Sequence, residues 1–429
     1  MWACMDHTPF ASLAVLTLLT VPAVAHAQNA PPPASASASV AAPAPENAPA
    51  PATLKFDPYA DIRYRLELVD QDGLPQDATA STLRIRAGVR LGEWHGFSAQ
   101  VEGEAIARIG PRDFNDTVNG RTTFPVVADP SDVLLNQAIV RWQPVMELSA
   151  SAGRQAVNLD NQRWFGSVGW RQNDQTLDTV RLTAAPVKEA KIDYLYAWRV
   201  NRVFGPDSAQ GIWHDTDIHG LRAAYAVEGF GTLTGYGYWL DIPAAPASNS
   251  QTIGVRLAGE RSMGNGIRLL YTGEYARQTD HAANPQAFGL DYWTGEAGIA
   301  RGGFTAKVGW ERLEGSGTVA LQTPLATLHA FNGWADKFLV TPPDGLRDVY
   351  GEVGYRFGAD SKLKGLALRA IIHDFAATAT SATYGQEIDL LASYPIRPNL
   401  VLLGKFAHYD ADLFATDTTK GWLSLQLTF

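Results

Sequence analysis

The chain has 429 residues, a formal net charge of −9 at pH 7 and 46% hydrophobic residues. This length would ordinarily hold two or three soluble domains. The acidic balance and the lack of a phosphate-binding loop argue against nucleic-acid binding. Cys4 is the sole cysteine, so an intramolecular disulfide is excluded as a source of stability.

The first residues read as a targeting segment. Ala11–Val24 is an uninterrupted run of apolar and small residues, and the site Ala25-His26-Ala27 follows it. This pattern predicts a secretory signal peptide over residues 1–27, too short to span a membrane. No Lys or Arg precedes the run, so a buried helix is the alternative reading.

Residues 28–54 are rich in Ala, Pro and Ser, which predicts a disordered, extended linker. From Phe56 onward the composition changes abruptly to alternating apolar and polar residues, and it keeps that character to the last residue. We therefore expect one domain over residues 55–429.

Apolar residues recur at every second position throughout this domain. In residues 82–91 (TLRIRAGVRL) every second side chain is apolar, and arginine occupies three of the alternate positions. Successive side chains of a strand point to opposite faces, so one face is apolar and the other carries fixed positive charge. Comparable segments of about ten residues recur, which is the signal of a transmembrane antiparallel β-barrel. Further examples lie at residues 61–68, 192–200, 304–311, 387–394 and 421–429.

Short connections alternate with long polar ones, as they do between the periplasmic turns and outer loops of outer-membrane barrels. Counting strands between them gives about eighteen, with both chain ends on the turn side and an aqueous channel inside. A soluble sandwich or solenoid is the alternative, but ten-residue strands are long for a sandwich. Aromatic residues gather near strand ends as interfacial girdles would: Trp142, Trp198, Trp239, Trp310, Tyr355, Tyr394, Trp422 and Phe429.

A cationic side chain facing lipid at mid-bilayer costs about 2–4 kcal/mol, so the charged face must line the lumen. Two readings of these charges stay open. One is a mixed-charge lattice that neutralises itself and stiffens the wall. The other is a basic field on the first two strands that attracts an anionic permeant. The inward cations predicted in this way are Arg63, Arg65, Arg84, Arg86, Arg90, Arg141, Arg181, Arg199, Arg256, Arg356, Arg369, Lys307 and Lys405. The inward acids include Asp61, Glu67, Glu102, Glu104, Asp193, Glu260, Glu352, Glu387 and Asp389.

The densest polar stretch, residues 153–182, interleaves arginines and acids with Trp164, Phe165 and Trp170. We expect it to fold into the channel mouth. Its run GRQ…NLDNQR…GWRQNxQTxD, followed by DYLYAWRVNRVFG at 193–205, resembles the alginate export family of bacterial outer membranes. That resemblance implies an eighteen-stranded barrel with a basic, constricted pore for an anionic polysaccharide. It implies permeant contacts at Arg154, Arg163, Arg171, Arg181, Arg199 and Arg202, with Asp178 and Asp193 as their acidic partners.

The function expected from these patterns is passive diffusion of anionic saccharides or related acids, such as an alginate-like polyuronate, through an arginine-lined lumen. The alternatives are a barrel hydrolase and a non-conducting structural or adhesin barrel. No catalytic motif, cofactor site or metal site is predicted. Expected partners are the acidic solute, outer-membrane lipid and lipopolysaccharide, periplasmic proteins, and the barrel-assembly machinery through the strand that ends at Phe429.

Overall fold

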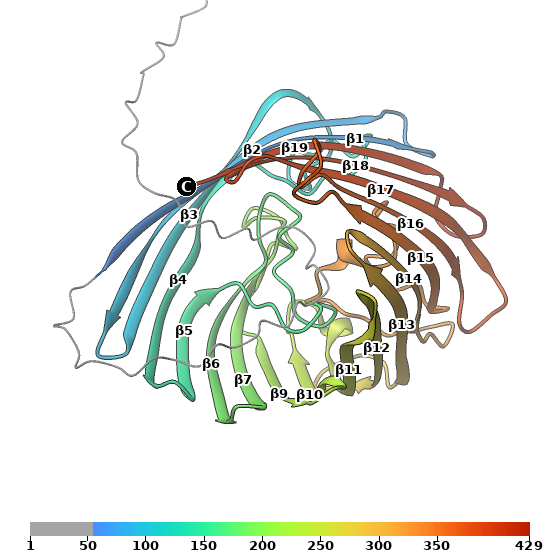
Figure 1. Ribbon diagram of the computed structural model, residues 1–429. Coiled ribbons are helices and arrows are strands. Elements are labelled where there is room, and N and C mark those ends of the chain that lie inside the picture. Colours follow the sequence, from blue (N-terminus) through green and yellow to red (C-terminus); the bar gives the residue numbers. More distant parts are fainter. Residues whose placement is uncertain (1–54) are drawn as a thin grey trace, which may run out of the picture.

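A computed structural model describes residues 55–429 of the chain (Figure 1). The predicted signal peptide and linker lie outside the described residues. Within them, no helix is long and apolar enough to cross a membrane. The strands are β1 Phe56–Gln71, β2 Ala78–Trp94, β3 Phe97–Asp113, β4 Asp132–Val145, β5 Leu148–Gln155, β6 Thr176–Val187, β7 Ala190–Asn201, β8 Ile212–Trp213, β9 Asp217–Val227, β10 Gly231–Asp241, β11 Ser250–Gly264, β12 Ile267–Asp280, β13 Gly289–Arg301, β14 Phe304–Leu313, β15 Leu346–Arg356, β16 Ala367–Ala376, β17 Thr383–Arg397, β18 Leu400–Ala411 and β19 Thr418–Thr428.

The sheet closes on itself. β1 pairs with β19 in antiparallel register, Asp61 opposite Thr428, and each long strand pairs with the next one along the chain. β8 has two residues and pairs only with the end of β7. Without β8 the wall has eighteen strands, all antiparallel, with both ends of the barrel domain at the short turns. The predicted fold class and strand number are confirmed. Closure leaves the sheet without a free edge, as a sheet inside hydrocarbon requires.

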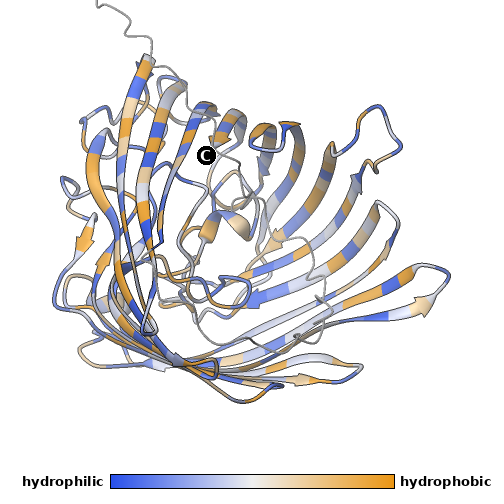
Figure 2. Cartoon of the chain, turned by 60° about the vertical axis from the view of Figure 1, so that its left-hand side comes forward, coloured by the Kyte–Doolittle hydropathy of each residue, from blue (hydrophilic) through white to orange (hydrophobic). Residues whose placement is uncertain are grey.

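Hydrophobic and hydrophilic residues alternate along the strands (Figure 2), and their exposure places the apolar set on the outer face. Val308 and Ile372 are 66% and 62% exposed on the outside, whereas Arg84 and Asp389 are fully buried inside. A closed barrel with this exterior lies in the outer membrane of a Gram-negative cell. Six of the predicted girdle aromatics are exposed: Trp142, Trp198, Trp310, Tyr355, Tyr394 and Phe429. Trp422 is not one of them: it is 4% exposed and stands opposite Glu67 on the lumen face.

Turn chemistry sets the two ends of the barrel apart. Asn265 and Gly266, between β11 and β12, both have positive φ, which suits a tight hairpin that follows the strand twist. The opposite end carries long connections at residues 114–131, 156–175, 202–216 and 314–345. Two of these, 156–175 and 314–345, fold back into the barrel instead of standing above it (Figure 1).

A charge placed on the outer face tests this orientation. Val308→Lys should lower the free energy of unfolding by about 2–4 kcal/mol, because the ammonium group would face hydrocarbon. Lys307→Arg, one residue away on the lumen face, is the matched control and should have little effect. Urea unfolding in lipid vesicles, followed by tryptophan fluorescence, measures both. Equal stability of Val308→Lys and the parent chain would contradict the assignment of faces.

Candidate functional site

The candidate site is the constriction that two loops form inside the barrel. We call residues 156–175 the constriction loop and residues 314–345 the cap loop. Their backbones bond to each other: the amide of Gly166 donates to the carbonyl of Leu325 at 2.8 Å, and that of Thr327 to the carbonyl of Gln162 at 3.0 Å. The side-chain amide of Gln175 also donates to the Leu325 carbonyl, at 3.1 Å. The two loops therefore form one inserted unit.

Aromatic packing holds this unit against one side of the wall. Trp164 of the constriction loop meets Tyr292 on β13 edge to face, with ring centroids 5.3 Å apart, and Phe165 meets Tyr238 on β10 at 4.9 Å. The indole nitrogen of Trp164 donates to Glu274 at 2.7 Å, so its polar atom is satisfied in the buried position. The predicted insertion of residues 153–182 into the channel mouth agrees with this packing.

The basic wall of β1 and β2 holds the opposite side of the constriction loop. Arg63 donates to the carbonyls of Gly169 and Arg171, and Arg65 donates to the carbonyl of Trp170. Three consecutive loop carbonyls are thus satisfied by two guanidinium groups. A buried carbonyl without a partner costs about 1–3 kcal/mol, so these arginines hold the loop in place.

Three of the four arginines of this wall, Arg65 among them, are also paired with acids. Arg65 pairs with Asp129, and Arg84 pairs with Asp61. Arg86 pairs with Glu104 and, at 2.7 Å, with Asp174 of the constriction loop. All four wall arginines are buried: Arg63, Arg65, Arg84 and Arg86. The arrangement matches the mixed-charge lattice, one of the two readings that the sequence left open.

Two arginines of the constriction loop connect it to the rest of the site. Arg171 lies 3.1 Å from Glu67 and 3.2 Å from Asp336 of the cap loop. Burial alone would lower the pKa of Arg171, but Glu67 and its other acidic neighbours raise it above the ordinary value. Arg163 lies 3.1 Å from Glu311 and donates to Asn332 of the cap loop at 3.0 Å. Both side chains are buried, so they support the loop structure.

An acidic wall on β17 holds the cap loop in the complementary way. Glu387 accepts the backbone amide of Ala335 at 2.7 Å, and Asp389 accepts that of Trp334 at 3.2 Å. The basic wall therefore binds loop carbonyls and the acidic wall binds loop amides. Donors on one wall and acceptors on the other thus satisfy loop groups of opposite polarity.

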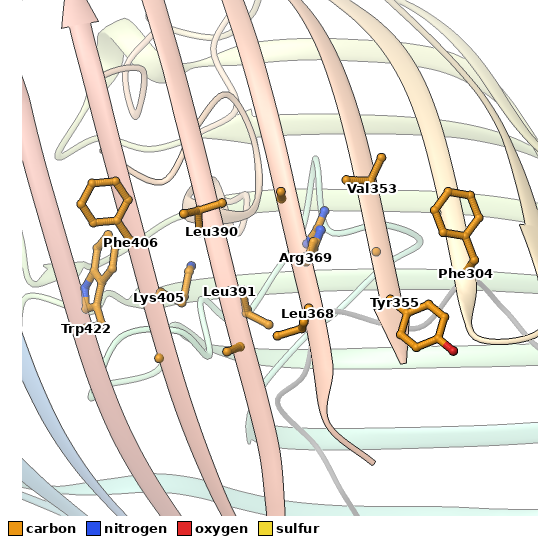
Figure 3. Close-up of a pocket in the computed structure, with 14 residues that line it drawn as sticks. Phe304, Val353, Tyr355, Leu368, Arg369, Leu390, Leu391, Lys405, Phe406 and Trp422 are labelled. Carbon is orange, nitrogen blue, oxygen red and sulfur yellow. The ribbon is translucent and has the colours of Figure 1, made fainter. Parts of the chain in front are cut away.

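Lys405 of β18 is the centre of a contact that we call the lysine latch, formed with His329, Asp336 and three tryptophans. Its ammonium nitrogen lies 3.7 Å and 4.0 Å from the ring centres of Trp334 and Trp170, and Trp422 closes a third side at 5.3 Å. Figure 3 shows Lys405 and Trp422 on this stretch of wall, beside the apolar residues of its outer face. Ring faces attract a desolvated cation, so the latch joins both loops to the barrel.

The hydrogen bonds of the latch fix the protonation of His329. Lys405 lies 2.7 Å from His329 Nε2 and can only donate, so Nε2 accepts and Nδ1 carries the proton. His329 Nδ1 then donates to Asp336 at 2.7 Å. Burial lowers the pKa of His329 to about 3, and the charges of Lys405 and Arg171 add to that effect against the attraction of Asp336. His329 is therefore neutral in the latch.

The predicted residues near β5–β7 divide between the two faces of the wall. Arg181 and Asp193 face the lumen and pair at 2.8 Å, as expected. Arg154 and Asp178 also pair, at 2.7 Å, but they stand on the outer face of the wall, and so does Arg199. Their sequence neighbours Gln155, Leu177 and Val200 point the other way and are buried inside the barrel. Strict alternation would place Arg199 in the lumen. A bulge at Trp198 inserts one residue and reverses the faces beyond it.

Arg202 follows β7, and its side chain packs within its own loop. Its guanidinium stacks over Trp213 at 4.2 Å and Phe204 at 4.7 Å, and it donates to the carbonyl of Gln210. Burial lowers its pKa to about 10. The Arg202 side chain thus orders its own loop, whereas its backbone carbonyl accepts a hydrogen bond from the side-chain amide of Asn173 in the constriction loop, at 3.4 Å.

Solved structures share this fold. The OccAB3 crystal structure of Acinetobacter baumannii has a TM-score of 0.69 at 14% identity, covering 87% of this chain and 99% of that one. OpdL of Pseudomonas aeruginosa has a TM-score of 0.67 at 16% identity, and OpdK with vanillate, from the same organism, 0.67 at 12%; each covers 87% of this chain and 98% of its own. These are outer-membrane barrels, and they are not alginate exporters. No family model and no curated protein sequence matches the chain.

The cap loop and the latch were missed from the sequence. The long connection at 314–345 was expected to be a plain outer loop, yet Leu321, Leu325 and Trp334 are buried within it. That apolar content is the signal that could have identified it, since a solvated loop has little reason to carry it. His329 carried no signal of its own.

Removing the latch cation should loosen the cap loop. Lys405→Met keeps the bulk within the tryptophan cage but removes the cation–π contacts and the bond to His329. We expect larger current fluctuations in single-channel recordings and faster proteolysis within residues 314–345. Lys188→Met, in an exposed turn, is the matched control because it removes the same charge outside the lumen. Quiet currents and unchanged proteolysis in Lys405→Met would contradict the latch.

The latch should also weaken in acid. A released His329 has a pKa near 6.5 and binds a proton that the docked residue, with its pKa of about 3, rejects. Docking is therefore fully favoured above pH 6.5, and it loses about 1.4 kcal/mol per pH unit as the pH falls from 6.5 towards 3. Current fluctuations should rise between pH 6.5 and pH 4.5. His329→Gln, which does not titrate, should abolish that rise; an identical rise in the variant would exclude His329 as its cause.

Proposed function

We propose that the chain is an outer-membrane channel through which small acidic solutes diffuse passively. The observation that carries this proposal is a set of lumen-facing cations that the loop lattice leaves unneutralised. Arg141 on β4 and Arg356 on β15 are exposed, and neither has an ion-pair partner within residues 55–429. Most other lumen cations that we predicted are paired, so these two bias the interior towards anions.

The constriction limits the size of the solute that can pass. The constriction loop and the cap loop occupy the lumen together, and their contacts with the wall are hydrogen-bonded and buried. A passage narrowed in this way favours compact acids over a wide polymer. An alginate-like polyuronate, the solute that the family resemblance implies, belongs to the same charge class and would have to pass this unit as an extended single chain.

One neighbour in structure supports the charge class. OpdK was crystallised with vanillate, which is a small aromatic carboxylate. Its identity to this chain is only 12%, so the likeness concerns the fold, and the transfer of a solute class is part of the proposal. A barrel enzyme or a non-conducting adhesin is tested by the same measurement, because neither requires an open, charge-selective pore.

Planar bilayers in a salt gradient measure the preference directly. We expect a conducting pore whose reversal potential indicates anions, and Arg141→Ser with Arg356→Ser should lower the anion-to-cation permeability ratio by about twofold or more. Liposome swelling should be faster with glucuronate or vanillate than with neutral solutes of equal size. Cation preference in the parent chain would overturn the acidic-solute proposal. An absence of conductance would favour the adhesin or enzyme alternative.

A further inference from the structure

A second feature of the lumen lies between the constriction and the short turns. Arg141 on β4 stands directly opposite Ser98 on β3 and Ser151 on β5, and Ser151 stands opposite Arg181 on β6. All four side chains face the lumen. They form a row across neighbouring strands in which cations alternate with small hydroxyl side chains, and we call it the arginine–serine row.

The spacing of the row leaves room for a ligand. Adjacent strands are about 4.8 Å apart, so Arg141 and Arg181 start about 10 Å from each other. The serine between them is too short to fill that gap. Guanidinium groups are long enough to converge over it or to hold two separate anionic groups, one each.

The charges around the row leave it cationic. Arg181 shares Asp193 with Arg222 and with Lys191, so one buried carboxylate serves three cations. Arg222 also pairs with Asp160. Among the charged residues closest to Arg141 are Arg181 and Arg90, both of the same sign.

Arg90 of β2 extends this cationic surface. Its guanidinium stacks on Tyr59 at 3.9 Å and lies 3.6 Å from Asp57, a pair that is about half exposed and therefore weak. Another acid along this wall is Glu102 on β3. It is buried and accepts hydrogen bonds from Asn136 and Gln137, at 2.7 Å and 3.2 Å. These amides are neutral and leave the charge of Glu102 in place, so Glu102 offsets one of the cations around the row.

The row lies on the turn side of the constriction and meets it at the β6 end, where Asp160 of the constriction loop pairs with Arg222 and Arg222 shares Asp193 with Arg181. Arg86 contacts the constriction loop through Asp174, and Arg90 is four residues further towards the turn after β2. At about 3.3 Å per residue, Arg90 is about 13 Å below the loop contact. Arg141 lies at the same depth in the barrel, because Arg90 and Arg141 are each four residues from the turn end of their strands, β2 and β4. A solute at the row is therefore reached freely from the turn side and only through the constriction from the other.

We propose that the arginine–serine row, with Arg90, is a binding site for solutes that carry two or more carboxylate groups, on the periplasmic side of the constriction. The inference rests on the proposed function and adds to it the place and the valence of the preferred solute. A monocarboxylate engages one guanidinium group, whereas a di- or tricarboxylate spans two. Affinity should rise steeply with the number of carboxylates.

One-sided block of single-channel current tests the site. Citrate, with acetate as the monovalent probe, is added to either chamber while chloride carries the current. Orientation is read from Lys188→Cys in the β6–β7 turn, labelled with a membrane-impermeant biotin maleimide and detected with streptavidin. We expect citrate to block at an at least tenfold lower concentration from the turn side, and acetate not to block in that range.

Arg141→Ser should raise the blocking concentration of citrate at least tenfold. Lys188→Ser removes a cation from the exposed β6–β7 turn, outside the lumen, and should leave the block unchanged. Heat-modifiable migration on gels shows that each variant is folded. Calorimetric titration of citrate into the detergent-solubilised barrel gives the same comparison without a current.

The two proposals fail in different ways. Equal citrate block from both sides, or a block that Arg141→Ser leaves intact, would overturn the site, even in a channel that keeps its anion preference. Block by acetate at the same concentration as citrate would overturn the requirement for two carboxylates. Cation preference of the parent channel would instead overturn the proposed function.

Discussion

The whole structure depends on the requirement that no backbone polar group or charge be left unsatisfied in hydrocarbon. Eighteen antiparallel strands meet it by closing the ladder between β1 and β19. Closure forces the side chains into two sets, and lipid selects the apolar set for the outside. Apart from charges at the loop ends of the strands, such as Arg154, Asp178 and Arg199, the strand charges then stand in the lumen, where they compete for water, for other charges or for the inserted loops.

The inserted loops use most of those charges. Arg63 and Arg65 bind carbonyls of residues 169–171, whereas Glu387 and Asp389 bind amides of the cap loop. A loop inside a lumen has lost water from its backbone groups, and a wall of fixed charge restores their partners at short range. The arginines that look from the sequence like permeant contacts therefore also have a structural cause. Because these arginines are buried, support of the loop backbone dominates over contact with a permeant within the loop lattice.

The fold was predictable because its signal is repeated along the chain: period two, long strands and alternating connection lengths do not depend on any one residue. The prediction of which face of the wall a single residue occupies was less secure. The bulge at Trp198 turns Arg199 outward, and no local sequence feature marks it. The cap loop and the Lys405–His329 contact join residues 76 positions apart, so they follow from tertiary packing that periodicity cannot report.

Selectivity in such a barrel depends on the charges that remain after the loops are held. A carboxylate passing Arg84 meets a fully buried guanidinium that Asp61 already neutralises, so its field at the solute is that of a dipole. Arg141 presents an uncompensated charge in a low-dielectric tube, and its field decays more slowly with distance. A few unpaired cations below the constriction can thus outweigh a larger number of paired ones within it. The position of unpaired charge, more than the total charge, is the variable on which permeation through this fold should depend.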